Sequence, residues 1–211
     1  TSAGDVRRNA LSDFTNVKRN GKIAMDLPEG IEMVNARICS PEDDVMLVTD
    51  SGRAIRFPVP DVRVFKGRKS TGVRGIRLAG GDRVVSMSVI RHFEATPDER
   101  AAYLKMRRAA AGAPEDESGE EDGNADAVLS AERFEEMQVA ENLILTITAK
   151  GIGKLSSSHD YPVRGRGGMG VAAIDRAMRG GPLVASFPVT LEDQIMLATS
   201  RGQSIRVPVM G

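Results

Sequence analysis

Short apolar runs separated by turn residues recur along most of the chain in one fixed order. The two clearest copies run from Asp44 to Val59 and from Gln194 to Val209, 150 residues apart. In each copy, an apolar run rich in β-forming residues is followed by a glycine-containing turn and a second apolar run that reaches Pro58 or Pro208. The pattern predicts a β-hairpin in each copy. Proline cannot donate a ladder hydrogen bond, so it should end the second strand.

Weaker copies extend this repeat to most of the sequence. Asn142–Lys154 resembles the hairpin, and Gly4–Arg8 resembles the second half of one. The copies are separated by steps of about 50 or about 100 residues, and the longer step falls to about 49 when residues 92–141, which match no repeat position, are left out. Further strands are expected at Gly75–Leu78, Val171–Ile174, Ile31–Ala36, Val84–Val89 and Leu183–Val189.

Four short strands in each unit of about fifty residues are typical of propeller-like blades. We therefore predict an all-β fold with a partial array of about three blades, and we expect it to be a fragment of a longer array because it begins and ends within a copy. An ordinary β-sandwich with accidental similarity is the alternative. It would not explain why four features recur with the same spacing: the hairpin, an Asp followed by an apolar residue, a basic glycine-bearing loop and a later apolar strand. The expected units are a partial blade (1–42), a blade (43–91), an insert (92–141), a blade (142–190) and the start of another (191–211).

The net charge of zero, from 29 basic and 29 acidic residues, conceals a strong asymmetry. Residues 1–91 carry 16 basic and 11 acidic side chains, residues 92–142 carry 5 and 14, and residues 143–211 carry 8 and 4. The repeats are therefore basic and the insert is acidic. Such a division within one chain suggests a polyanionic partner for the basic part.

The basic charge is concentrated in a glycine-bearing loop that recurs once per copy, at 18–22, 66–74 and 164–170. Loops in the same phase should lie along one rim of the array. Short of aromatic residues, they favour contact with the phosphates of duplex DNA, with little reading of sequence, over stacking on single-stranded bases. A curved rim would bend the duplex. The predicted DNA-binding residues are Lys18, Arg19, Lys22, Lys66, Arg68, Lys69, Arg74, Arg77, Arg164 and Arg166.

The insert has the sequence signals of helices. Thr96, Pro97 and Glu99 form a capping-box pattern that predicts a helix to about Ala111, and Ala127–Ala140 could form a second. Between them, Glu115–Asp126 contains seven acidic residues and is predicted to be disordered. The insert is either a tolerated, solvated extension or an acidic arm that competes with DNA for the basic rim.

No catalytic or metal-binding pattern is apparent. One cysteine (Cys39) and two histidines (His92 and His159) cannot form a structural zinc site, and no apolar run approaches the roughly 18–20 residues that span a bilayer. Cys39 is expected to be a small buried side chain. Because a single cysteine permits no internal disulfide, we expect a reducing compartment and hence a cytoplasmic protein. The recurring Asp13, Asp61 and Asp160 are interpreted as turn residues rather than metal ligands, and Tyr161 as a core residue.

Several sequences resemble one family closely: Leu11-Ser-Asp-Phe14, Val45-Met-Leu47, Gly72-Val-Arg-Gly-Ile-Arg-Leu78, Gly81-Asp-Arg-Val-Val-Ser86 and Gly151-Ile-Gly-Lys154. They are similar to the C-terminal domain found in the A subunit of bacterial DNA gyrase. The resemblance implies a β-pinwheel, in which neighbouring blades exchange a strand, and a rim that wraps duplex DNA, placing the protein at the nucleoid. It also implies that the whole enzyme introduces negative supercoils, uses ATP and Mg²⁺, and pairs with an ATP-hydrolysing B subunit in a heterotetramer. The catalytic tyrosine of that family lies in its N-terminal portion, so no catalytic residue or cofactor is expected here.

One motif departs from the family pattern. The family's gyrase box reads Gln-Arg-Arg-Gly-Gly-Lys-Gly, and the nearest match agrees with it at Arg166, Gly167, Gly168 and Gly170. We interpret this match as a degenerate copy, with the true box upstream of Thr1. Two other functions remain open: the corresponding DNA-bending domain of topoisomerase IV, and a propeller whose rim binds an acidic protein. The box-like loop consists of Arg164, Gly165, Arg166, Gly167, Gly168, Met169 and Gly170.

Overall fold

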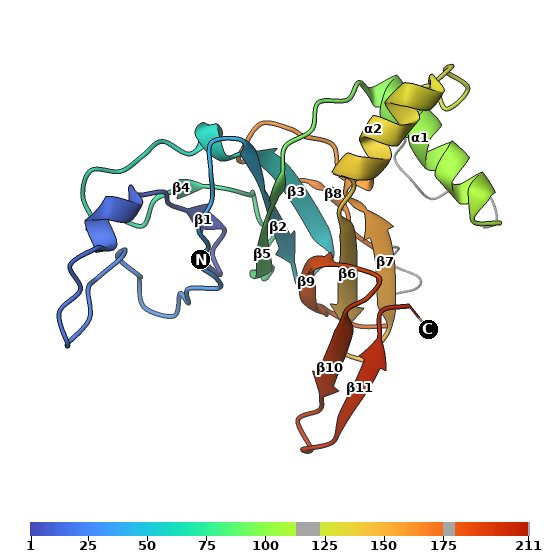
Figure 1. Cartoon of the computed structure of the whole chain (residues 1–211). Helices are drawn as coiled ribbons and strands as arrows, with labels where there is room; N and C mark the ends of the chain where they lie inside the picture. Colours follow the sequence, from blue (N-terminus) through green and yellow to red (C-terminus); the bar gives the residue numbers. More distant parts are fainter. Residues whose placement is uncertain (113–122, 175–179, 211) are drawn as a thin grey trace.

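The fold is built from short antiparallel strands, as seen in a computed structural model that describes residues 1–112, 123–174 and 180–210 (Figure 1). Two α-helices lie between the fifth and sixth strands, and short 3-10 turns, labelled η, follow several hairpins. The elements are β1 (Asp5–Val6), η1 (Leu11–Phe14), β2 (Asp43–Thr49), β3 (Arg53–Pro58), η2 (Val59–Asp61), β4 (Val73–Arg74), β5 (Val84–Arg91), α1 (Pro97–Ala110), α2 (Ala131–Ala140), β6 (Leu143–Thr148), β7 (Gly153–Ser157), η3 (Ser158–Asp160), β8 (Val171–Ala172), β9 (Leu183–Val189), β10 (Gln194–Ala198) and β11 (Ser204–Pro208).

The predicted hairpins are confirmed. β2 pairs with β3 and β10 pairs with β11 in the same antiparallel register, with Asp44 opposite Pro58 and Gln194 opposite Pro208. The turns contain Gly52 at φ 86° and Gly202 at φ 80°, a left-handed conformation that costs glycine little. Both second strands end at their proline.

Neighbouring blades exchange a strand. The four-stranded sheet has the order β5-β2-β3-β8, and its last strand comes from the following copy of the repeat. β8 reaches back to pair with Arg53 and Ala54, just as β4 reaches back to pair with β1 in the preceding copy. The next sheet has the order β7-β6-β9, and the β10–β11 hairpin extends away from it (Figure 1). This exchange makes the array a β-pinwheel.

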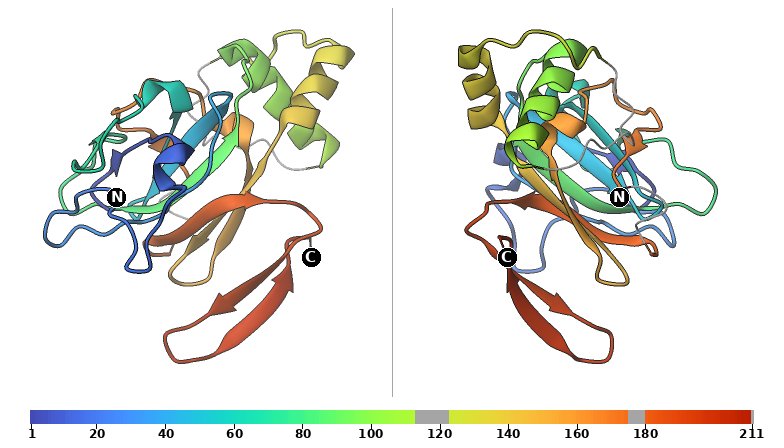
Figure 2. Two further views of the ribbon diagram at one scale, coloured as in Figure 1. Left: turned by 60° about the vertical axis from the view of Figure 1, so that its left-hand side comes forward. Right: turned by 90° about the vertical axis from the view of Figure 1, so that its right-hand side faces the viewer.

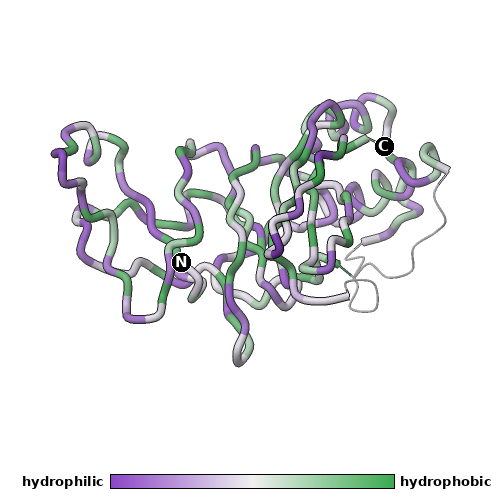
Figure 3. Tube along the Cα trace, turned by 90° about the horizontal axis from the view of Figure 1, so that it is seen from below, coloured by the Kyte–Doolittle hydropathy of each residue, from purple (hydrophilic) through white to green (hydrophobic). Residues whose placement is uncertain are grey.

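The core is aliphatic and lies on both faces of the middle sheet. Val45 and Leu47 face one buried cluster, whereas Met46 and Val48 face a second cluster that also contains Ile144 of the next blade. Alternate side chains of β2 therefore join successive blades, which explains why this strand has an uninterrupted apolar sequence. Figure 3 shows hydrophobic and hydrophilic stretches alternating over short distances along the chain.

Three sequence predictions about this region were wrong. Ile31–Ala36 forms no strand, because the equivalent strands β5 and β9 pair with β2 and β6, and residues 1–30 contain no counterpart of those partners. The strand predicted at Gly75–Leu78 instead occupies Val73–Arg74, since the chain then bends and the Gly75 and Ile76 N–H groups both donate to the Gly4 carbonyl. Cys39 is exposed rather than buried, because it lies in this unpaired first segment.

Both helices expected in the insert form, and the first begins at its predicted capping box. Thr96 and Glu99 make a complete capping box at α1, and α2 begins four residues later than predicted because Ser130 caps it through the Arg133 N–H. Tyr103 and Met137 pack the helices together, and α1 contacts η3 of the third blade (Figure 2). Of the stretch predicted to be disordered, 115–122 lies outside the described residues. Residues 123–126 are ordered, contrary to the prediction, because the Asn124 N–H donates to Asp98 Oδ1 at 2.8 Å and Asp126 pairs with Lys105 at 2.5 Å.

Candidate nucleic-acid interface

The three basic loops occupy the same place in successive copies. Each follows a 3-10 turn, η1, η2 or η3, and the second and third then enter the exchanged strands β4 and β8. The recurring Asp13, Asp61 and Asp160 lie in those turns, as predicted. Each later loop contacts the segment that directly follows the loop before it. The Asp26 N–H donates to the Ser70 carbonyl at 3.2 Å, and the Arg77 N–H donates to the Gly168 carbonyl at 2.8 Å. We call this continuous row of loops the basic rim.

The ten predicted DNA-binding residues fall into two groups by exposure. Three of them are half-buried, namely Lys22, Arg68 and Arg166. The other seven are exposed and supply a row of solvent-facing cations: Lys18, Arg19, Lys66, Lys69, Arg74, Arg77 and Arg164.

The half-buried members donate to backbone carbonyls of nearby segments. Lys22 Nζ lies 2.5 Å from the Asp13 oxygen, and Arg68 Nη1 lies 3.3 Å from the Ile23 oxygen. Arg166 donates through Nε to the Asp61 carbonyl at 3.2 Å and through Nη1 to the Arg74 carbonyl. Part of the donor capacity of these side chains therefore holds the rim together.

Two of the recurring loop glycines, Gly72 and Gly170, lie where a side chain would clash with the preceding blade, whereas Gly21 has open space around its Cβ position. A Cβ added at Gly72 would lie 2.3 Å from the Val6 carbonyl oxygen, and one added at Gly170 would lie 2.2 Å from the Ala54 carbonyl oxygen. Gly72 and Gly170 therefore permit the exchanged strand to approach the preceding blade. Gly165, in contrast, has open space around its Cβ position.

One exposed cation just before the second basic loop was not predicted. Arg63 lies with its guanidinium 3.9 Å from the centre of the buried Phe65 ring, and Arg7 covers the same ring at 4.7 Å. Stacking on an aromatic ring orients a guanidinium at modest entropic cost. The signal was present in the sequence, because residues two apart in an extended segment point the same way.

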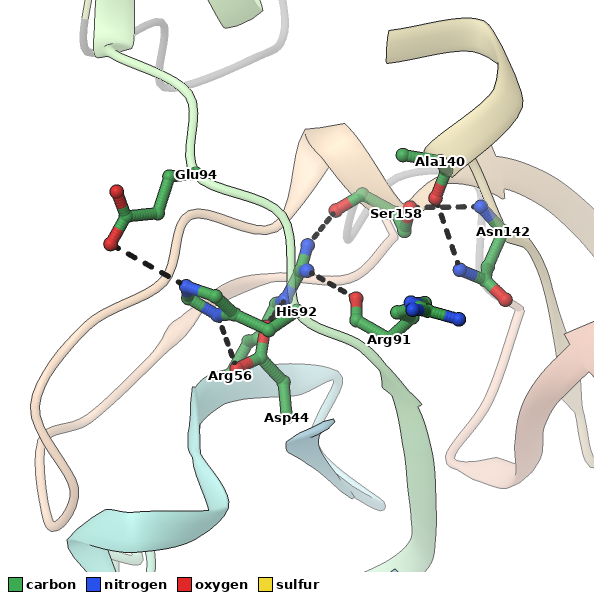
Figure 4. A network of polar contacts seen from close by, with 8 residues as sticks. All are labelled: Asp44, Arg56, Arg91, His92, Glu94, Ala140, Asn142 and Ser158. Atoms are coloured by element: carbon green, nitrogen blue, oxygen red, sulfur yellow. Dashed lines mark hydrogen bonds and ion pairs between the residues drawn. The ribbon is translucent and has the colours of Figure 1, made fainter. Parts of the chain in front are cut away.

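A buried polar cluster lies where the insert leaves the second blade (Figure 4). Asp44 is fully buried and accepts from Arg56 Nε at 2.7 Å, and its other oxygen lies 2.8 Å from His92 Nδ1. Arg56 also donates to the carbonyls of Ser158 at 3.0 Å and Arg91 at 3.3 Å. This cluster joins two blades and the first residue of the insert, and nothing in the sequence repeat identified it.

His159 serves the insert rather than a reaction. Its Nε2–H donates to the Met137 carbonyl at 2.9 Å, and its ring meets Tyr103 edge-on at 4.9 Å between ring centres. Burial lowers the pKa of His159, so the neutral ring is the form that fits here. Burial also raises the pKa of Tyr161 to about 12, in agreement with its predicted place in the core.

Within residues 1–112, 123–174 and 180–210, no group of three His, Cys, Asp or Glu side chains is placed to hold a metal ion. Among the same residues, no helix is long and apolar enough to cross a membrane.

Comparison with known proteins identifies the family. A family model described as the DNA gyrase C-terminal domain, a β-propeller, matches residues 1–40, 43–91, 142–181 and 193–209. The DNA gyrase A subunit of Granulibacter bethesdensis is 48% identical over 99% of this chain, and that of Rickettsia bellii is 41% identical over 98%. The chain spans only about a quarter of these relatives, 24% and 23% of their lengths.

A solved structure supports the fold. The crystal structure of the C-terminal domain of DNA topoisomerase IV superimposes with a TM-score of 0.68, covering 99% of this chain and 50% of that one at 17% identity. At this identity, the likeness establishes the pinwheel architecture alone. The sequence matches establish the rest: the chain belongs to the family of DNA gyrase C-terminal domains.

Proposed function

We propose that this domain binds duplex DNA along the basic rim, through phosphates and with little sequence preference. The observation that supports it best is the row of seven exposed Lys and Arg side chains on loops that touch one another in sequence order. A continuous row of cations matches a phosphate backbone, and the described residues carry no stacking aromatic on these loops.

In the whole protein, this contact would wrap DNA so that the enzyme can introduce negative supercoils. The C-terminal domain is not the catalytic region of this family. We therefore assign ATP and Mg²⁺ to the rest of the enzyme and its B subunit, no cofactor to this chain, and the nucleoid as the place of action. The corresponding topoisomerase IV domain would bend DNA without driving supercoiling, and a protein-binding rim would need an acidic partner.

Duplex affinity measured against salt tests the proposal. If all seven exposed cations neutralise a phosphate, the log–log slope approaches about −6, and each lost contact reduces its magnitude by about 0.9. The double variant K66A/R164A removes equivalent rim cations and should reduce it by about 1.8. R201A removes one charge from the turn between β10 and β11 and serves as the control. A flat salt response, or equal effects of both variants per charge removed, would refute rim binding.

A further inference from the structure

The contacts between successive basic loops repeat with the period of the sequence. Arg68 donates to the Ile23 carbonyl and Arg166 donates to the Arg74 carbonyl. The two arginines are 98 residues apart and the two acceptors are 51 apart. The recurring glycines Gly21, Gly72 and Gly170 are separated by the same steps of 51 and 98.

A backbone hydrogen bond repeats beside each arginine. The Asp26 N–H donates to Ser70, and the Arg77 N–H donates to Gly168, again with donors 51 and acceptors 98 residues apart. We call each such pair of contacts, one from an arginine side chain and one from the backbone, a loop bridge. At the second bridge, the Gly167 N–H also donates to the Gly75 carbonyl at 2.7 Å.

We infer that Arg68 and Arg166 are positioning residues that fix each basic loop against the one before it, and that phosphate contact falls to the exposed cations around them. Lys66 and Arg164 occupy equivalent places two residues earlier and are exposed, whereas Arg68 and Arg166 are half-buried against carbonyl oxygens. Because DNA follows a smooth path, the relative placement of successive cation clusters determines how far the duplex bends.

The arginine fork suits this role better than lysine would. Arg166 spans two acceptors, the carbonyls of Asp61 and Arg74, with Nε and Nη1 of one rigid group. A lysine carries the same charge on a single flexible ammonium and cannot reproduce that fixed geometry. The charge-preserving variant R166K therefore separates positioning from simple attraction to phosphate.

The test compares R166K and R166A with R164A in the 211-residue chain. Amide exchange at Arg77 reports the bridge without DNA, and energy transfer between the ends of a bound duplex of about 30 base pairs reports bending. Both Arg166 variants should speed exchange at the Arg77 amide by about tenfold or more, as expected when a hydrogen bond from a charged donor no longer secures the loop. They should also reduce energy transfer between the duplex ends at saturating protein. The salt slope should change by less than half of the roughly 0.9 that one phosphate contact contributes.

R164A should do the opposite, lowering the magnitude of the salt slope by about 0.9 and leaving exchange at Arg77 unchanged. The inference would be overturned if R166K matched wild type in amide exchange and DNA bending. It would also be overturned if R166A reduced the magnitude of the salt slope by about 0.9 while the Arg77 amide stayed protected. If circular dichroism shows that R166A does not fold, R68K reads the other bridge through the Asp26 amide. Only the bending part of the inference rests on the proposed DNA binding. If no variant binds DNA, the proposed function fails, and amide exchange still decides whether the bridge exists.

Discussion

Replacing Arg56 by alanine should destabilise the domain far more than removing any exposed cation. Arg56 is 4% exposed and Asp44 is 0% exposed, so the variant leaves a buried carboxylate beside His92 without its guanidinium and removes the donor to Ser158 and Arg91. Removing one member of a buried, hydrogen-bonded ion pair typically costs about 3–5 kcal/mol. For a chain of this size, each kcal/mol lowers the melting temperature by roughly 2–4 °C, so we expect a fall of about 6–20 °C.

Thermal and urea unfolding of R56A measure this cost, with R83A as the matched control. Arg83 pairs with Asp50 at 3.4 Å but is 63% exposed, so its loss should cost at most about 1 kcal/mol. The double variant D44L/R56L installs the residues that blade three has at the equivalent positions, Leu143 and Leu155. It should cost less than R56A, because no charge remains buried without its partner. A loss below about 1 kcal/mol in R56A, or a double variant less stable than R56A, would refute this reasoning.

Three further predictions concern the blades and the insert. Burial lowers the pKa of His159, so the stability it contributes is complete above its unfolded pKa of about 6.5 and is lost as pH falls below that value. Between pH 8 and 5.5, the melting temperature should therefore fall more steeply for wild type than for H159Q, and parallel curves would contradict this. G170A places a Cβ 2.2 Å from the Ala54 carbonyl oxygen at φ 69° and should lower the unfolding free energy by at least about 2 kcal/mol. G165A, with nothing within 4 Å, should change it by less than about 0.5 kcal/mol, and equal costs would disprove the strand-exchange role of Gly170. T96A removes the acceptor of the α1 capping box and should cost about 0.5–2 kcal/mol, seen as faster amide exchange at Glu99, and unchanged exchange would show that the cap contributes nothing.

The sequence predicted those elements whose local chemistry and tertiary surroundings agree. The β2–β3 hairpin has alternating core residues, a turn glycine and a terminal proline, and all three act within a few residues. Ile31–Ala36 has a comparable apolar pattern but forms no strand, because a ladder also needs a partner that these residues lack. Tertiary pairing decides such cases, and a pattern within one segment does not contain it.

The basic loops could be located from the sequence, but the sequence did not show which of their side chains are exposed and which contact neighbouring carbonyls. Lys66 and Arg68 stand two positions apart in one loop, and their charges are equivalent in any count of the sequence. Only the structure shows that Arg68 reaches a carbonyl of the preceding loop while Lys66 faces solvent. The close approach of Gly72 and Gly170 was not predictable for the same reason, since the backbone they approach belongs to a segment far away in sequence.

The buried ion pair changes how the insert should be understood. Register places Leu143 and Leu155 of the third blade where the second blade has Asp44 and Arg56, so a blade does not itself require the pair. The second blade is the one that the insert leaves, and the partners of the pair include Arg91 and His92 at that exit. The helices then return to the third blade, where His159 donates to α2 and Asp160 lies 3.8 Å from Arg108 of α1. An extension that is merely tolerated would need neither contact. The described helices of the insert are therefore part of the junction between two blades, and removing 92–141 as a whole should destabilise that junction even if the acidic residues between the helices prove dispensable.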